Sequence, residues 1–160
     1  MLKGLTPSGG DRSGKMHSFE TTIGRLRSEG FKLTPQRLSV IRYLIGNKTH
    51  PTAAAIYTDL KKKYPSLSFS TVYNTLNMLE KIGEVQSLHL FDEFLNYDPD
   101  TVAHYHFICR RCSGIIDIFP RDGENMTMPE GDISGHRIES AHIVLKGTCS
   151  SCLQGAAVGE

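Results

Sequence analysis

The chain has 160 residues, of which 39% are hydrophobic and 22% charged, and its formal net charge is +1. This length suits one ordinary domain or two small ones, and the composition is typical of a folded chain rather than a disordered one. No apolar run approaches the roughly 20 residues of a membrane helix, and residues 1–15 lack the apolar stretch of a secretion signal. We therefore expect a cytoplasmic protein with no membrane contact.

Charge is unevenly distributed between the two halves of the chain. The first 95 residues carry 13 Lys and Arg against 8 Asp and Glu, whereas the rest carry 5 against 9. A basic half joined to an acidic half suggests two modules, the first of which faces a polyanion. Chance also produces differences of this size, so charge alone leaves nucleic-acid binding open.

Four short helices are predicted in the basic half, from apolar residues at three- and four-residue spacings. Gly30 ends the first helix, and Thr34 caps the second. Thr52 caps the third, Ser68 leads into the fourth, and Gly83 ends it. The predicted ranges are 19–29, 35–45, 52–63 and 70–82.

Two strand-like runs follow the helices, at 85–90 and 94–97, and form a predicted hairpin. Helices followed by a hairpin are typical of a winged helix-turn-helix, whose last helix puts its N-terminal residues into the major groove of DNA. An ordinary capped amphipathic helix would show the same pattern. The candidate DNA contacts carry hydroxyl, amide or guanidinium groups: Arg37, Ser70, Thr71, Tyr73 and Asn74.

The acidic half is rich in β-forming residues. Strands are predicted at 104–109, 114–119 and 136–148, the last with an interruption near Glu139, and residues 120–135 are expected to form a polar loop or an irregular helix. We expect an α+β protein with two domains. Its parts are a disordered tail (1–18), a winged-helix DNA-binding domain (19–97), a hinge (98–103), a second domain (104–152) and a final tail (153–160).

Four cysteines form two C-x-x-C pairs, Cys109 with Cys112 and Cys149 with Cys152. Disulfides are disfavoured in a reducing compartment, so the pairs indicate a metal site. Four thiolates suit one tetrahedral structural Zn²⁺ per chain, which would stabilise a domain too small for a large core. Two redox-active dithiols or four buried free thiols are the alternatives.

A second set of candidate ligands contains His104 and His106. These residues lie two apart on a predicted strand, so both side chains project to the same side. Asp117 lies on the next predicted strand, and Asp98 lies in the hinge. Mixed nitrogen and oxygen ligands suit Fe(II), Mn(II) or Zn(II) better than a thiolate-selective ion. Surface histidines and ordinary loop carboxylates are the alternative.

The other histidines are weaker candidates. Alone, His50 indicates only a solvated residue at a helix start, and Glu124 with His142 could form a weak extra metal site. No catalytic spacing, phosphate-cradling glycine loop or H-E-x-x-H motif is present, so we do not expect an enzyme. Three histidines are expected on the surface: His17, His89 and His136.

Together these motifs resemble the ferric uptake regulator (Fur) superfamily over residues 19–152. The resemblance implies a homodimer with a winged-helix DNA-binding domain and a C-terminal α/β dimerisation domain, bound to a palindromic double-stranded DNA operator. It implies structural zinc on the four cysteines and a regulatory Fe²⁺ or Mn²⁺ on His50, Asp98, His104, His106 and Asp117. The motifs are LTPQR at 33–37, THPTA at 49–53, STVYNTL at 70–76, HYHFICRRC at 104–112 and GTCSSC at 147–152.

Within the superfamily, the details are most similar to the peroxide-sensing PerR branch. Asp98 and Asp117 stand where iron sensors more usually have Glu, Tyr105 where they often have Asp, and Asn74 where they often have Arg. The resemblance implies a repressor that leaves DNA when Fe(II)-catalysed oxidation modifies His50 or His104. Ser113 departs from the family pattern, in which Gly commonly follows the second cysteine.

Three other interpretations stay open. An iron-responsive regulator of the same fold would sense the level of metal rather than peroxide. A small metal-dependent hydrolase would use the His/Asp site, although five protein ligands leave little room for a substrate. A thiol redox protein would use the C-x-x-C pairs.

Overall fold

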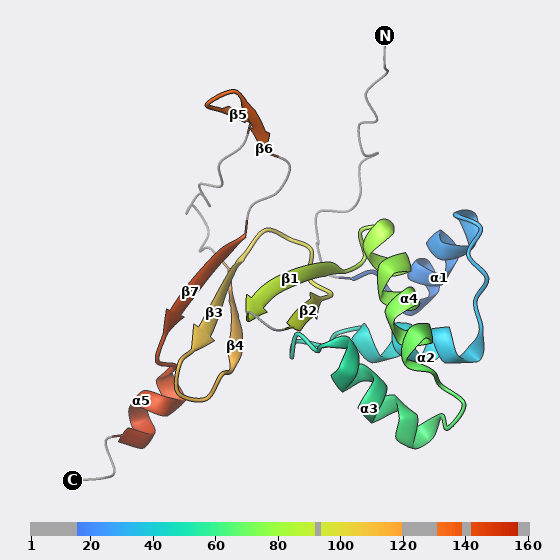
Figure 1. Cartoon of the computed structure of the whole chain (residues 1–160), viewed down its shortest axis with the longest axis horizontal. Helices are drawn as coiled ribbons and strands as arrows, with labels where there is room; N and C mark the ends of the chain where they lie inside the picture. Colours follow the sequence, from blue (N-terminus) through green and yellow to red (C-terminus); the bar gives the residue numbers. More distant parts are fainter. Residues whose placement is uncertain (1–15, 92–93, 120–130, 139–141, 157–160) are drawn as a thin grey trace. The chain divides into compact units, whose positions relative to one another are not determined.

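The computed structural model describes residues 16–91, 94–119, 131–138 and 142–156. Helices come first along the chain and strands follow, so the expected α+β class is confirmed (Figure 1). The described residues divide into two compact units. The first unit lies within Met1–Leu88 and Tyr97–Val102, and the second unit within His89–Asn96 and Ala103–Glu160.

Four helices build the first unit: α1 (Phe19–Ser28), α2 (Pro35–Leu44), α3 (Ala53–Lys63) and α4 (Phe69–Lys81). Each begins at a side-chain oxygen that accepts a backbone N–H three residues further on, and these caps belong to Ser18, Thr34, Thr52 and Ser68. The four predicted helices are confirmed to within a residue or so at each end. Helix α4 begins one residue earlier than predicted because Ser68 itself is the cap.

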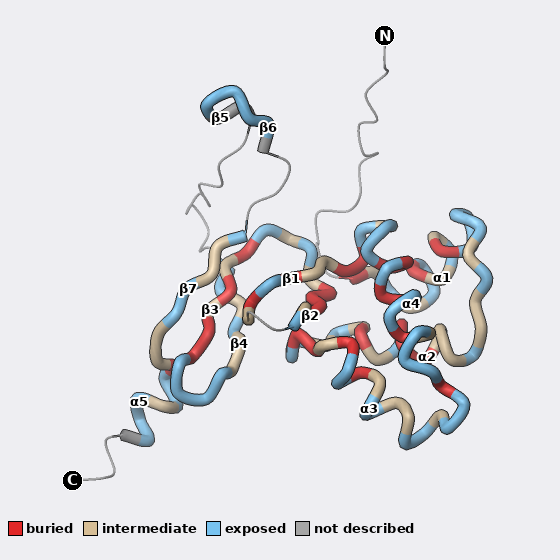
Figure 2. Tube along the Cα trace, in the orientation of Figure 1, coloured by how far each residue is buried: buried red, intermediate tan, exposed pale blue. Residues whose placement is uncertain are grey.

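The core of the first unit forms between the apolar faces of these helices. Ile41 of α2, Ile56 of α3 and Leu76 of α4 are completely buried. Figure 2 shows buried segments within each of these helices in red. Burying one such side chain stabilises a fold by about 1.5–3 kcal/mol. The same packing leaves the opposite side of α4 exposed, where Tyr73 and Asn74 lie.

Strands β1 (Gln86–Phe91) and β2 (Phe94–Asp98) pair as a two-stranded sheet, which confirms the predicted hairpin. Strand β2 continues one residue beyond its predicted end, so Asp98 is a buried strand residue and not part of an open hinge. The Tyr97 N–H donates to the Pro51 carbonyl at 3.0 Å, which joins the end of β2 to the loop before α3.

Residues 16–18 were expected to belong to a disordered tail, yet they are held in the first unit. Met16 is buried, and its N–H donates to the Pro99 carbonyl at 2.8 Å. The His17 N–H donates to the Glu84 carboxylate at 3.0 Å, and Ser18 caps α1. The helical domain therefore begins at least three residues earlier than expected, while residues 1–15 lie outside the described part of the chain.

A three-stranded sheet forms the centre of the second unit, in the order β4 (Ile115–Ile118), β3 (Tyr105–Cys109), β7 (Ile143–Gly147). Strand β3 pairs antiparallel with β4 and parallel with β7. Because cross-strand partners project to the same side, Phe107, Ile116 and Leu145 share one face of the sheet. That face is apolar and exposed, whereas His106 and Asp117 share the other face.

Two expectations for this unit are wrong. A second hairpin, β5 (Gly131–Ile133) with β6 (His136–Ile138), replaces the end of the expected polar loop. Ser134 and Gly135 join its strands with φ angles of 52° and 81°, as in the tightest hairpin turns. Helix α5 (Ser150–Ala156) replaces the start of the expected tail, and its first turn closes as the Leu153 N–H donates to the Cys149 carbonyl at 2.9 Å.

Candidate functional site

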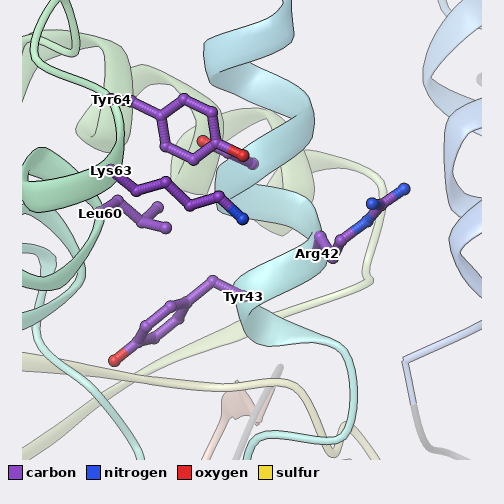
Figure 3. Close-up of a pocket in the computed structure, with 6 residues that line it drawn as sticks. Arg42, Tyr43, Leu60, Lys63 and Tyr64 are labelled. Atoms are coloured by element: carbon purple, nitrogen blue, oxygen red, sulfur yellow. The ribbon is translucent and has the colours of Figure 1, made fainter.

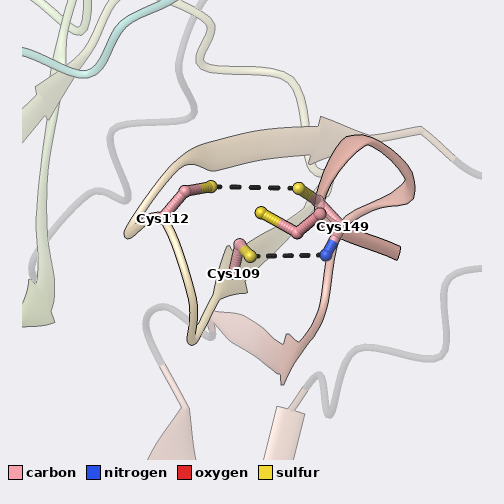
Figure 4. A group of neighbouring side chains, drawn as sticks. Cys109, Cys112 and Cys149 are labelled. Carbon is pink, nitrogen blue, oxygen red and sulfur yellow. Dashed lines mark hydrogen bonds between the residues drawn. The ribbon is translucent and has the colours of Figure 1, made fainter. Parts of the chain in front are cut away.

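Four cysteine side chains meet where β3 and β7 end. Cys109 ends β3, Cys112 lies in the turn beyond it, and Cys149 and Cys152 lie at the start of α5. All four sulfur atoms lie within 4.8 Å of one another. Cys112 Sγ lies 3.8 Å from Cys149 Sγ, and the Cys149 N–H donates to Cys109 Sγ at 3.3 Å (Figure 4). Four converging sulfurs are the ligand set of a structural zinc ion.

The four thiols strongly affect each other's ionisation. Hydrogen bonds from the backbone N–H groups of Cys149 and Cys112 lower the pKa of Cys109 to about 6. Hydrogen bonds with the side chains of Cys149 and Cys112 hold the proton of Cys152 and raise its pKa to about 12. Four thiolates this close are unfavourable without a cation. A divalent cation would offset the repulsion between the four thiolates, so these residues fit Zn²⁺.

The turn between β3 and β4 accommodates the sulfur of Cys112, and one residue of this turn has a strained backbone. The Ser113 N–H donates to the Cys109 carbonyl at 2.9 Å, and Ser113 has a φ of 57°, in the left-handed region that favours glycine. A Cβ added to Gly114 would lie only 3.3 Å from Cys112 Sγ. Gly114 thus provides the space, while Ser113, the departure seen in the sequence, adopts the strained conformation.

His104, His106 and Asp117 form a buried cluster on the face of the sheet opposite the exposed apolar one. The Nε2 atoms of the two histidines lie 3.0 Å apart. Asp117 Oδ1 lies 3.4 Å from His104 Nε2 and 3.9 Å from His106 Nε2. Two imidazoles and a carboxylate that converge in this way suit a divalent metal such as Fe²⁺ or Mn²⁺.

His50 and Asp98 lie together in the first unit. His50 Nε2 is 3.7 Å from Asp98 Oδ1, and both side chains are almost completely buried. His50 has a φ of 49°, a strained value for a residue with a side chain, and such strain is often found at functional sites. The structure therefore buries His50, which its sequence position alone indicated to be solvated.

Gln86 holds the Asp98 carboxylate in place and was not identified from the sequence. Gln86 Nε2 donates to Asp98 Oδ2 at 2.9 Å and to the Asp100 carbonyl at 2.8 Å. The Asp100 N–H donates to Asp98 Oδ1 at 2.8 Å. The sequence does contain one indication of this role: Gln86 begins β1, and the partner strand β2 ends at the candidate ligand Asp98.

The weaker candidates have varied outcomes. His142 is exposed, and Glu124 lies outside the described residues, so their possible extra site stays a prediction. His89 and His136 are exposed, as expected. His17 was expected on the surface, but its Nδ1 lies 2.9 Å from a carboxylate oxygen of the buried Glu84. That interaction depends on tertiary contacts with the end of α4.

Most of the candidate DNA contacts lie in the first turns of α4. Ser70, Tyr73 and Asn74 are exposed, and Thr71 is half-buried. The Ser68 hydroxyl accepts the Thr71 N–H at 3.1 Å and lies within 3.0 Å of the hydroxyls of Ser70 and Thr71. Arg37 lies apart from this group, on α2, where its guanidinium donates to the Lys32 carbonyl.

A shallow cavity lies between α2 and α3, with about 420 Å³ of space open to solvent (Figure 3). None of the candidate metal ligands or DNA contacts lines it, so it has no part in the sites described above. None of the helices in the part of the chain that the structure describes combines the length and the hydropathy of a membrane span. The cavity is lined by Ser39, Arg42, Tyr43, Leu60, Lys63 and Tyr64.

Comparisons with known proteins agree with these features. Residues 28–145 match the model of the Ferric uptake regulator family. The peroxide-responsive repressor PerR of Staphylococcus aureus is 38% identical over 141 residues, which cover 85% of this chain and 92% of that protein.

Two solved structures are similar to this one. PerR from Streptococcus pyogenes has a TM-score of 0.50 and 29% identity, over 84% of this chain and 92% of that one. The ferric uptake regulator Fur of Helicobacter pylori has a TM-score of 0.67, over 87% of this chain and 96% of that one. Its sequence identity is 24%, so this second likeness bears on the fold alone.

Proposed function

This chain belongs to the ferric uptake regulator family, and from that membership we propose that it is a peroxide-responsive repressor that binds DNA as a homodimer. It is a transcriptional regulator rather than an enzyme, and its four-cysteine site is a structural zinc site. The observation that carries the proposal is the cluster in which Asp117 of β4 meets His104 and His106 at the start of β3, the strand that ends at the four cysteines. A repressor of this kind acts in the cytoplasm, where the operator DNA lies.

We assign the regulatory metal, Fe²⁺ or Mn²⁺, to ligands from both units. His50 and Asp98 come from the first unit, and His104, His106 and Asp117 come from the second. Metal bound by both units would fix the hinge that follows Asp98. In a homodimer the hinge sets the separation of the two α4 helices, and the half-sites of a palindromic operator lie a fixed number of helical turns apart. Coupling of this kind is typically about 1–3 kcal/mol, roughly 5- to 150-fold in affinity.

The exposed apolar face of the β4-β3-β7 sheet supports the homodimer. Ile116 and Leu145 are 44% and 42% exposed in the isolated chain, and Ile118 lies on the same face. Contiguous apolar surface of this kind commonly marks a protein interface. A second copy of the chain would bury it, as the family resemblance implies. The palindromic operator follows from the same two-fold symmetry.

Peroxide sensing follows if iron occupies the site. If Fe²⁺ were held by these residues, it would supply the redox chemistry that activates peroxide, which Mn²⁺ would not supply under the same conditions. We expect one peroxide oxygen to enter the imidazole ring of His50 or His104 while the other leaves as water. The oxidised ring is a poor ligand, so the metal is lost and the DNA is released.

The test compares iron-loaded and manganese-loaded protein after peroxide treatment. Operator binding and peptide masses are measured on the same samples. The expected result is loss of binding in the iron form alone, with one added oxygen on a peptide that contains His50 or His104. Release of DNA without any change in mass would contradict the proposal. Release by chelator but not by peroxide would instead identify an iron-responsive repressor.

A further inference from the structure

Phe69 is the first residue of α4, and its ring packs against Tyr57 of α3 although the residue is 48% exposed. Its ring lies 5.8 Å from the ring of Tyr57, at an interplanar angle of 81°. Lys61 Nζ lies 5.5 Å from the centre of the same Tyr57 ring and donates to the Leu67 carbonyl at 2.7 Å. Phe69 thus packs against a small cluster of side chains from α3.

Packing within the first unit does not require this exposure. The buried side of α4 is formed by Val72, Leu76 and Leu79. Phe69 and Tyr73 lie four residues apart and therefore neighbour each other on the exposed side. Single exposed apolar residues are common on protein surfaces. An ordered aromatic ring in the first turn of a DNA-reading helix is a different case, because that turn is the one that reaches base edges.

The groups around Phe69 in the first turn of α4 are polar or positively charged, so Phe69 is the residue of this turn that offers an apolar contact. The hydroxyls of Ser70 and Thr71 lie within 3.0 Å of the Ser68 hydroxyl at the helix cap. Lys61 and the N-terminal end of α4 contribute positive charge that favours DNA phosphate. The apolar group that B-DNA presents in its major groove is the C5-methyl of thymine.

We propose that Phe69 contacts the methyl group of a thymine in each operator half-site and so determines part of the sequence specificity. The inference rests on the proposed function, because it requires α4 to bind the major groove of an operator. Tyr57 acts as a positioning residue, since it holds the Phe69 ring without any need to touch DNA itself. Little conformational entropy is then lost when the ring meets DNA.

The experiment replaces operator thymines one at a time with deoxyuridine, which lacks only the C5-methyl group. Affinities are measured with the full chain loaded with zinc and Mn²⁺. For wild type we expect about a fourfold loss for each methyl that is buried against Phe69, at one thymine position in each half-site. Phe69→Ala should bind more weakly and show no further loss at that position. Phe69→Leu should keep most of the discrimination.

Controls separate this inference from the proposed function. Leu153→Ala removes a side chain on α5 that is 60% exposed, and it should leave the discrimination unchanged. Phe69→Gln provides a second polar replacement if Phe69→Ala lowers thermal stability. An equal loss on deoxyuridine for wild type, Phe69→Ala and Phe69→Gln would overturn the inference and leave the repressor intact. Wild type without metal-dependent operator binding would overturn the proposed function itself.

Discussion

Asp117 lies directly opposite His106 in the antiparallel pairing of β3 with β4, and its Oδ1 lies 3.9 Å from His106 Nε2. The strand pairing itself therefore brings the carboxylate to the imidazole, with no need for a flexible loop. His104 reaches the same point because it lies two residues before His106. These three groups are preorganised within the second unit, so under the proposed function the coupling between the units depends on the other two proposed ligands, His50 and Asp98.

Gln86→Ala should weaken binding of the regulatory metal by about 10- to 100-fold, the usual effect of losing a partner that orients a ligand. The variant loses the hydrogen bond from Gln86 Nε2 to Asp98 Oδ2, which is 2.9 Å long. The measurement is a Mn²⁺ titration by calorimetry. Gln36→Ala is the matched control, because the Gln36 side chain donates to the Ser66 hydroxyl in an exposed position away from Asp98. Equal Mn²⁺ affinities for the two variants would show that Gln86 does not contribute to metal binding.

Arg25→Ala should destabilise the first unit because it leaves the carboxylate of Glu84 buried without its cation. The Glu84 side chain is completely buried and contacts Arg25 Nη1, while Arg25 Nη2 donates to the Ile82 carbonyl at 2.6 Å. We expect a loss of about 2 kcal/mol in the free energy of unfolding. This is below the roughly 3–5 kcal/mol of fully buried pairs, because Arg25 is 41% exposed.

Urea denaturation measures this difference. Arg27→Ala is the control, since Arg27 is exposed on the same helix. Its change should stay within about 0.5 kcal/mol, as is usual for surface substitutions. Similar losses for the two variants would show that the Glu84 contact contributes little.

The helices could be predicted because their signals are local. A helix cap is formed by a side chain and a backbone N–H only three residues further on, as at Thr34, Thr52 and Ser68. The residues that form the cap are therefore visible together in a short stretch of sequence. The paired C-x-x-C turns are equally local, and the structure brings all four sulfurs together.

Features that depend on distant contacts could not be predicted. Gln86 bonds to Asp98 because strands β1 and β2 pair. The buried carboxylate of Glu84 contacts His17 and Arg25, which lie about 60 residues earlier in the chain. Helix α5 was missed because its residues, Ser150–Ala156, favour helix weakly. It forms where the cysteine site holds its first turn. The strain at His50 was also invisible in the sequence, since φ depends on the fold around it.

Ser113→Gly should stabilise the second unit by about 0.5–1 kcal/mol, because glycine relieves the left-handed strain and gives back part of that gain as unfolded-state entropy. Ser113 has a φ of 57° in the turn that carries Cys112. The control is Ser134→Gly, with a φ of 52° in the β5–β6 turn, which should give a similar gain. Thermal unfolding measures both variants, and only Ser113→Gly should slow the loss of zinc to a chelator. A lower melting temperature for Ser113→Gly would contradict the strain argument.

Acid should release the structural zinc. The pKa of Cys109 is lowered from 9.0 to about 6 in the folded chain. A depressed pKa contributes stability that is present above the unfolded value and is lost as the pH falls through the folded value. Zinc binding requires thiolates and lowers their pKa further. Zinc content per chain, measured after desalting at stepped pH, should therefore stay at one near neutrality and fall as the pH drops through and below about 6. Loss of zinc while the pH is still above neutral would contradict this order.

Operator binding with and without Mn²⁺ tests most directly whether a metal bound by His50 controls DNA affinity. Wild type should gain roughly 5- to 150-fold in affinity when Mn²⁺ is added, and His89→Ala should gain as much because His89 is exposed. His50→Ala, still loaded with zinc, should lose nearly all of the gain. If His50→Ala kept the full response to Mn²⁺, the proposed coupling between the two units would be wrong.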